Sequence, residues 1–301
     1  MSTADLPVPP ASVEDVVPDA RGRRFARLNA TTVIGAIGLI IVAALVLVAI
    51  FAPALAPYDP TERVGRPFAT PSAEHPLGTN DIGQDLLSEL IYGTRVSLTV
   101  GLVAATVALL IGTTVGIIAG FYPRLLGSVL MRIVDIVLIL PFLPLLIILA
   151  AYLGRSLLNT VLVIGILIWA GSARVIRSQV LSLTQRDYVV AARAMGARDL
   201  HIIVKHILPL TLLLAIGEFV QATAGAILLE ASLSFLGLGD PLQKSWGSIL
   251  YWAQVRGAFL TPAWQWWVLP PGLMIMAAAL GFALIGFALE QRVNPRLRQA
   301  R

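Results

Sequence analysis

The chain has 301 residues, of which 57% are hydrophobic, 13% are charged and none is cysteine, so a thiolate metal site and a thiol nucleophile are excluded. A soluble domain carries roughly 25% charged residues, so about half of the usual solvated surface is missing and the chain is expected to face lipid. The net charge of +5 does not indicate a nucleic-acid partner, because basic residues on the cytoplasmic loops of a membrane protein give the same total.

The chain begins with a polar segment, residues 1–30, which is too long for the n-region of a signal peptide and is predicted to be a disordered cytoplasmic tail. A spanning helix needs roughly 20 mostly apolar residues. Six segments meet this requirement: Thr32–Ala52, Val96–Phe121, Ile133–Tyr152, Leu157–Ala173, Pro209–Leu229 and Trp267–Leu289. We therefore predict an all-α polytopic membrane protein with about six transmembrane helices, in which residues 31–297 form the transmembrane domain.

Two details of these spans leave alternatives open. Pro141 and Pro144 lie inside the third span and indicate either a gating hinge or a fixed kink, which neighbouring helices tolerate. Gly112, Gly116 and Gly120 repeat every four residues along the second span and predict a close helix–helix face. That face lies either within this chain or against a partner.

Six spans place both chain ends on one side of the membrane, and the basic residues indicate which side. If the N-terminus is cytoplasmic, the outer connections hold six of the 22 Lys and Arg residues and the inner segments hold the other 16. The six outer residues are Arg63, Arg66, Arg95, Arg155, Lys244 and Arg256. This bias follows the positive-inside rule, so both termini are predicted to be cytoplasmic.

The cytoplasmic connection at residues 174–206 is long but does not have the composition of a disordered loop. The stretch from Asp187 to Met195 favours a helix, and Gly196 fits the position just after a helix end. Asp199 can cap a second short helix, Leu200–His206, which runs into Pro209. Two short helices that meet at a glycine and carry small residues are typical of a docking element.

This connection resembles the EAA loop of ABC importer permeases. The family pattern is Glu-Ala-Ala, three residues, Gly, nine residues and then Ile-x-Leu-Pro. The matching residues here are Ala191, Ala192, Gly196, Leu208 and Pro209. Val190 replaces the glutamate and His206 replaces the isoleucine, so the acidic anchor of the loop is missing.

Two further blocks resemble the C-type permeases of dipeptide, oligopeptide and nickel importers. One runs from His75 to Leu98 and follows the family pattern His-Pro-Leu-Gly-Thr-Asp, Gly-Arg-Asp and Tyr-Gly-Ala-Arg-x-Ser-Leu, with Asn80 and Gln84 in place of charged residues. The other runs from Glu230 to Gly247. The chain is therefore identified as a member of this permease family, and the resemblance extends over Thr32–Leu297.

The resemblance implies a non-catalytic permease subunit of an ATP-driven importer in the bacterial inner membrane. Its implied partners are a second, homologous permease, two ABC ATPase subunits or domains and an external substrate-binding protein. ATP and Mg²⁺ are expected on the ATPases, because no phosphate-binding loop occurs in this chain. The implied cargo is a dipeptide or oligopeptide, and a nickel chelate or glutathione is the alternative within the same family.

Two groups of residues are assigned to the two ends of the permease, one to coupling with the ATPase and one to the outer mouth of the pathway. The ATPase-coupling residues are Asp187, Ala191, Ala192, Gly196, Ala197, Asp199 and Pro209. The external segment, residues 58–90, is expected to be ordered over the mouth of the pathway, since turn formers alternate with apolar anchors in it; the alternative is a merely solvated loop. Its candidate residues are His75, Gly78, Asp81, Gly83 and Asp85.

Polar residues within or bordering the spans are candidates for the pathway. Glu218 and Gln221 form a polar stripe on the fifth span, which either lines the pathway or makes hydrogen bonds between helices. Asp135 follows Arg132 by three positions, so an intrahelical pair is the favoured interpretation. Glu230 is placed at the outer end, where ordinary solvation is expected.

Two other classes of function are less well supported by the sequence. A self-sufficient secondary transporter predicts an internal repeat with paired broken helices, which the sequence does not show. An intramembrane enzyme needs a catalytic set at one depth. The three histidines are divided between the two sides of the membrane, so we expect no catalytic, cofactor or metal site in this chain.

Overall fold

The computed structural model describes residues 20–293, and it describes side chains from residue 30 to residue 291. The described chain is built from helices and connecting segments and contains no extended strand. The α-helices are α1 Ala20–Ile50, α2 Ala52–Leu55, α3 Leu86–Phe121, α4 Leu125–Ile139, α5 Phe142–Leu153, α6 Leu157–Thr184, α7 Asp187–Ala194, α8 Asp199–Ile202, α9 Leu208–Phe235, α10 Trp246–Val255 and α11 Leu269–Val293. This composition confirms the predicted all-α class.

Five stretches of helix in the described residues are long and apolar enough to cross a bilayer. They are Ala30–Ile50, Leu86–Phe121, Leu157–Thr184, Asp199–Phe235 and Trp264–Gln291. Helices α4 and α5 make a sixth span if they are counted together, although they are bent by 89°. The predicted number of about six is therefore confirmed.

The third predicted span, Ile133–Tyr152, is wrong as a continuous helix. Helix α4 ends at Ile139, and Leu140 has an extended backbone with φ −62° and ψ 139°. A residue that precedes proline disfavours the helical region, so Pro141 forces this break. The kink is thus a sharp turn between two short helices.

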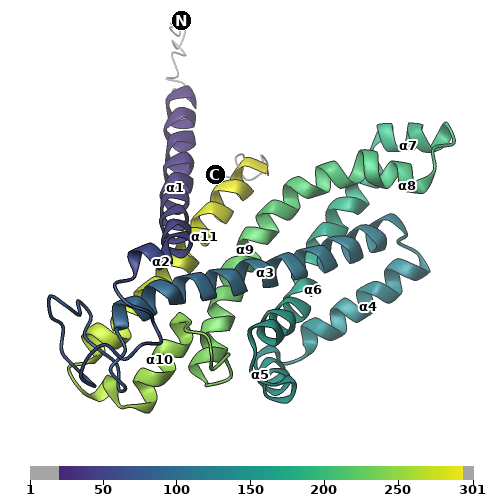
Figure 1. Ribbon diagram of the computed structural model, residues 1–301. Helices are drawn as coiled ribbons and strands as arrows, with labels where there is room; N and C mark the ends of the chain where they lie inside the picture. The colour runs from purple at the N-terminus through teal and green to yellow at the C-terminus, as the bar shows by residue number, and fades with distance from the viewer. Residues whose placement is uncertain (1–19, 294–301) are drawn as a thin grey trace, which may run out of the picture.

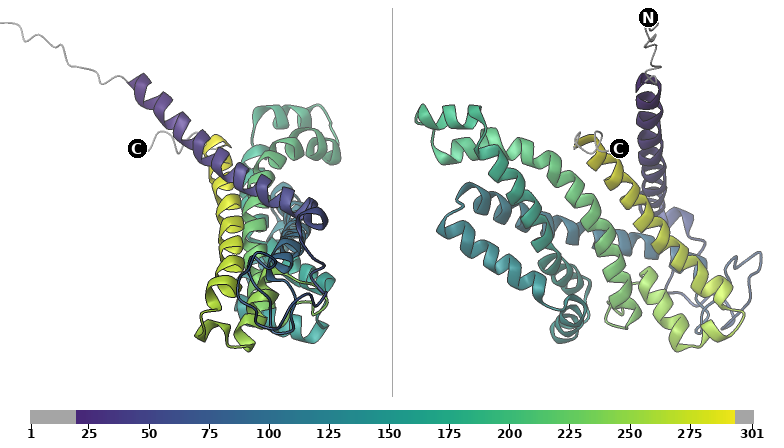
Figure 2. Two further views of the ribbon diagram at one scale, coloured as in Figure 1. Left: turned by 60° about the vertical axis from the view of Figure 1, so that its left-hand side comes forward. Right: turned by 180° about the vertical axis from the view of Figure 1, so that it is seen from behind.

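Both described chain ends lie at the same end of the molecule as α7 and α8 (Figure 1). The connection between α2 and α3 and helix α10 lie at the opposite end, and the view from behind shows the same arrangement (Figure 2). Helices α3, α6 and α9 run between these two ends, so movement at one end can be transmitted to the other through helices.

Helix α3 packs closely along α6, and glycines make this approach possible. A Cβ at Gly112 would lie 2.9 Å from the carbonyl oxygen of Trp169, and one at Gly116 would lie 2.8 Å from that of Ala173. A Cβ at Gly120 would come within 2.7 Å of Val180. The glycine face predicted on the second span is therefore used within this chain.

Several element boundaries differ from the predictions because helices continue past the apolar stretch. Helix α6 extends to Thr184, so the predicted cytoplasmic connection 174–206 begins inside a helix. Helix α3 begins at Leu86, since Asp85 caps it by accepting a hydrogen bond from the Ser88 amide, so the predicted external segment 58–90 ends in a helix. Residues 20–30 of the predicted tail belong to α1, while 1–19 and 294–297 lie outside the described residues.

Candidate functional site

Helices α7 and α8 form a two-sided element at one end of the molecule. Its inner side is a small core that includes Val189, Ala192 and Ile202, which pack with residues of α3 and α6. Its outer side exposes apolar side chains, with Met195 82% and Leu200 72% accessible. Tyr188, Val190 and Val204, on the same element and the turn that follows it, are also exposed. We call these exposed apolar residues of the element, Tyr188, Val190, Met195, Leu200 and Val204, the apolar docking face.

The turn between α7 and α8 is the one that the sequence predicted. Gly196 has φ +81°, which is the left-handed conformation. Its amide donates to the carbonyl of Arg193, and the amide of Ala197 donates to that of Ala192. These two hydrogen bonds make a Schellman motif, which satisfies the last carbonyls of α7. Asp187 occupies the first turn of α7 and Ala191 lies on the same helix.

The predicted capping role of Asp199 is wrong. The N-cap position of α8 belongs to Arg198, and Asp199 lies in the first turn. Its carboxylate instead accepts a hydrogen bond of 3.0 Å from the hydroxyl of Tyr122, which follows α3 directly. This hydrogen bond raises the pKa of Tyr122, so the phenol remains a donor at neutral pH. The guanidinium of Arg193 lies 5.4 Å from the ring centre of Phe121.

The predicted second helix, Leu200–His206, is also wrong in its geometry. Helix α8 ends at Ile202 and continues as a π-helical turn, Ile203–Ile207, directly into α9. Pro209 has no amide hydrogen to donate, and its ring would collide with the carbonyl of Lys205 in a regular helix. A wider turn avoids this collision. The docking element is consequently continuous with α9 and tied by side chains to α3.

The external segment is ordered by a second set of interactions. His75 Nδ1 lies 3.0 Å from Asp85 Oδ1, and both side chains are buried. Gly78 and Gly83 have φ of +69° and +84°, and a Cβ at either position would collide with a backbone carbonyl. These contacts agree with the predicted order of this segment. Its position over a pathway remains a prediction.

A buried polar cluster, which sequence reasoning missed, fastens the external segment to the helices. Lys244 Nζ donates to Glu89 Oε1 at 2.7 Å and to Gln84 Oε1 at 2.9 Å. Asn80 Nδ2 donates to the same Glu89 oxygen at 2.9 Å. The side-chain amides of Asn80 and Gln84, which depart from the family pattern, thus both form hydrogen bonds with the Lys244–Glu89 ion pair. Asp81 adds an ion pair of 2.7 Å with Arg256.

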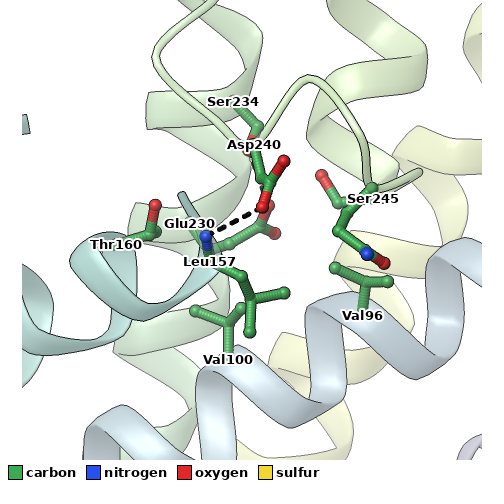
Figure 3. Close-up of a pocket in the computed structure, with 9 residues that line it drawn as sticks. Val96, Val100, Leu157, Thr160, Glu230, Ser234, Asp240 and Ser245 are labelled. Atoms are coloured by element: carbon green, nitrogen blue, oxygen red, sulfur yellow. Dashed lines mark hydrogen bonds between the residues drawn. The ribbon is translucent and has the colours of Figure 1, made fainter. Parts of the chain in front are cut away.

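Glu230, expected to be solvated, is instead almost fully buried near the C-terminal end of α9 (Figure 3). Ser234 donates to Oε1 at 2.7 Å and Ser97 donates to Oε2 at 3.0 Å. The prediction is wrong because α3 and the segment before α10 cover this end of α9. A cavity of about 10 Å³, the size of one water, lies beside the carboxylate. Asp240 also lines this cavity and accepts a hydrogen bond from the Leu157 amide.

Asp135 pairs with a different residue from the one predicted. Its carboxylate lies 2.6 Å from the guanidinium of Arg174 on α6, and both side chains are partly exposed. The predicted partner, Arg132, lies on the same helix and is not used. The pair therefore joins α4 to α6, because the 28-residue α6 carries Arg174 up beside α4.

Glu218 and Gln221 line one groove between α6 and α9. Their predicted role in the pathway stays a prediction. The groove has a volume of about 370 Å³ and is open to the outside of the chain. The other lining residues are Ile168, Gly171, Ser172, Val175, Ala222 and Gly225. Ser172 from α6 therefore faces the same groove as Glu218 from α9. We call this feature the α6–α9 groove.

The candidate residues therefore occupy separate places. The docking element lies at one end, the α6–α9 groove lies along two spans, and the external segment and Glu230 lie at the other end. Within the described residues, no group of three or more His, Asp or Glu side chains could hold a metal ion. This arrangement is that of an all-α membrane protein with candidate residues at both ends of its helices and in one groove between them.

Comparison with known proteins identifies the class and then the family. Residues 112–299 match the family described as binding-protein-dependent transport system inner membrane component, and residues 34–76 match the N-terminal TM domain of oligopeptide transport permease C. The chain is thus a membrane permease component. It belongs to the family of binding-protein-dependent transport system inner membrane components, on the branch of the C-type peptide permeases.

Individual relatives resemble the chain over nearly its whole length. It is 42% identical to the dipeptide transport system permease protein DppC of Alkalihalophilus pseudofirmus, over 87% of this chain and 86% of the relative. The chain is 38% identical to the di/tripeptide transport system permease protein DppC of Pseudomonas aeruginosa, over 87% of this chain and 88% of the relative. The chain is 34% identical to the glutathione transport system permease protein GsiD of Pectobacterium atrosepticum, over 92% of this chain and 90% of the relative.

Proposed function

We propose that the chain is one of two homologous permeases that together form the translocation path of a peptide importer. Two ABC ATPases bind ATP and Mg²⁺ on the cytoplasmic side, and an external binding protein delivers the peptide. The chain itself carries out no chemistry. Both of its termini and the docking element α7–α8 face the cytoplasm, which agrees with the basic bias of 16 against six residues.

The observation that carries this proposal is the apolar docking face. Exposed apolar residues that gather on one element indicate an interaction surface, and the element that carries these residues packs on α3 and α6 through its small core. Val190 stands on this face where the family has glutamate, so the contact with the ATPase is more apolar here. An ATPase that moves this element would move α3 through Tyr122 and α9 through the continuous π-helical turn.

The external end supports the second half of the proposal. The segment 58–85 is held by buried hydrogen bonds and ion pairs and therefore presents a fixed surface. We infer that this surface lies over the outer mouth and receives the binding protein. Replacing residues 76–85 by a Gly/Ser linker should cut uptake and leave membrane insertion intact.

Peptides are the preferred cargo because the dipeptide and di/tripeptide relatives share 42% and 38% identity with the chain. Glutathione is the second candidate, since a glutathione permease relative is 34% identical over 92% of this chain. Because glutathione is itself a tripeptide, one assay can compare the two.

The test is uptake by the reconstituted complex. The tagged chain, expressed with its second permease and ATPases, should be isolated as one complex in lipid. Proteoliposomes should then take up a labelled dipeptide only when the binding protein is outside and ATP is inside. Uptake by this chain alone, without ATPases, would instead establish a secondary transporter. Faster uptake of glutathione than of dipeptides would select the second candidate.

A further inference from the structure

The α6–α9 groove has the size and polarity of a small-molecule site. Its volume of about 370 Å³ lies within the roughly 300–1,000 Å³ usual for ligand pockets. Most of its wall is apolar or glycine, and three polar side chains converge on it: Ser172 from α6, and Glu218 and Gln221 from α9. Residues three apart on a helix share a face, so both α9 groups point to the same side.

The glycines of this groove differ from those that serve packing. A Cβ at Gly171 or Gly225 would meet no atom within 4 Å, whereas one at Gly116 would collide with α6. Gly171 and Gly225 are therefore not required for the chain to fold on itself. They keep the wall of the groove flat, so that a molecule outside this chain can approach the helix backbone closely.

The charge in the groove has one sign. Glu218 forms no ion pair among the residues whose side chains are described, and the Ser172 hydroxyl lines the same groove. Glu290, at the end of α11, is a second carboxylate close enough to interact electrostatically with Glu218. A carboxylate in a bilayer is costly unless a polar group or a cation accompanies it. The groove thus favours a positively charged guest.

We propose that the α6–α9 groove holds the cationic amino end of the cargo during its passage, with Glu218 as the charge partner. This inference rests on the proposed function and specifies the chemical class that the groove selects. An ammonium group has three donors. The Glu218 carboxylate, the Gln221 side-chain carbonyl and the Ser172 hydroxyl supply matching acceptors from two helices.

A test that needs no peptide uses the absence of cysteine from the chain. Gly225→Cys, introduced into the complete complex in lipid nanodiscs, places a thiol in the groove without a steric clash. The thiol is reacted with two methanethiosulfonate reagents, one carrying a trimethylammonium group and one carrying a sulfonate group. The ratio of the cationic to the anionic reaction rate is then divided by the same ratio for a free thiol in solution. The cationic reagent should be favoured, and Glu218→Gln should reduce the ratio about five- to tenfold.

Matched variants separate the local charge from other causes. Glu74→Gln removes a carboxylate from the external segment and should leave the ratio unchanged. Gly171→Cys reports on the same groove from α6 and replaces Gly225→Cys if that variant does not assemble. Thiols that stay unreactive at both positions, with and without ATP, would show that no aqueous path reaches the groove and would overturn the proposal.

The second measurement is protection of the thiol by the dipeptide Ala-Ala. The dipeptide concentration that gives half-protection should be about tenfold higher in Glu218→Gln than with Glu218 in place. In Glu218→Asp, which retains the charge, the increase should be smaller. An unchanged reagent ratio or unchanged protection in Glu218→Gln would each overturn the proposal. A failure of the proposed function is distinct, because it is seen as absent dipeptide uptake by the wild-type complex, whereas the reagent ratio is measured without peptide.

Discussion

Gly196 shows how a single backbone conformation can support a docking surface. A Cβ at this position would meet no atom within 4 Å, so the penalty of a side chain arises from φ +81° alone. For a β-branched residue this penalty is roughly 1–2 kcal/mol. We expect Gly196→Val to insert into the membrane but to lose ATPase association or to uncouple hydrolysis from uptake. Co-purification and hydrolysis per peptide transported measure the effect.

Two variants control for this change. Gly196→Asn adds a side chain of similar size that tolerates the left-handed region, so it should retain most activity. Arg198→Ala alters a nearby charge and should be mild. Native transport by Gly196→Val with normal ATPase stoichiometry would show that α7 and α8 are not the coupling element.

Glu230 is expected to contribute to stability through its hydroxyl donors. Leaving a buried hydrogen-bond donor without its partner costs roughly 1–3 kcal/mol, and Ser97 and Ser234 both donate to the Glu230 carboxyl group. Glu230→Ala should therefore lower the thermal unfolding midpoint of the purified complex by several degrees. The midpoint of Glu230→Gln should fall between those of the wild type and Glu230→Ala. The midpoint of Glu74→Ala, a change at an exposed site, should match that of the wild type. An unaltered midpoint in Glu230→Ala would contradict this role.

At the scale of elements, the contact between α3 and α6 is set by backbone approach. Gly116→Ala should destabilise the subunit by about 1–3 kcal/mol, as overpacking does, because its Cβ would lie 2.8 Å from the Ala173 carbonyl. Gly217→Ala is the matched change on α9, where a Cβ meets nothing, and it should be neutral or slightly stabilising. Thermal unfolding of both variants in detergent decides the matter, and equal midpoints would refute the packing argument.

The link between α3 and α8 should affect coupling more than folding. Tyr122→Phe removes the hydroxyl that donates to Asp199 and leaves the ring in place. We expect the number of ATP molecules hydrolysed per peptide to rise severalfold, with normal expression. Tyr152→Phe, at a site 87% exposed, is the control and should change nothing. If Tyr122→Phe keeps the native ratio, the movement does not pass through α3.

The existence and type of the helices were predictable, because apolar runs of about 20 residues have few other outcomes in a membrane. Their ends were not, since α6 continues for eleven residues past Ala173, where hydropathy falls but helical hydrogen bonding does not. The break at Leu140 follows from Pro141, yet the choice between a kink and an 89° turn depends on tertiary packing. The π-helical turn before Pro209 likewise depends on the continuous path from α8 to α9.

For the whole molecule, the orientation in the membrane is directly testable. Both ends and the docking element share one side, and the external segment has the other (Figure 1). In the cysteine-free chain, Glu74→Cys should react with an impermeant maleimide in intact cells, whereas Arg193→Cys should react only after lysis. Labelling of Arg193→Cys in intact cells would invert the proposed topology.

The candidate site was predictable where it is local in sequence. The Gly196 turn depends on residues within one helix end, and the Glu218–Gln221 stripe depends on one helix period. The partner of Asp135 and the burial of Glu230 were predicted wrongly, because Arg174 and Ser97 come from other helices, which only the packed structure brings near. Lys244 and Glu89 were missed for the same reason, since 155 positions separate them.

That separation has a consequence for how the protein is made. Glu89 enters the membrane early in synthesis, but its partner Lys244 is synthesised 155 residues later. At about 5–20 residues per second, the ribosome needs roughly 8–30 s to supply it. During this interval the carboxylate has no ammonium partner, and the external segment has only its internal hydrogen bonds. We therefore expect a nascent chain that stalls before Lys244 to be cleaved by a membrane protease sooner than the finished chain.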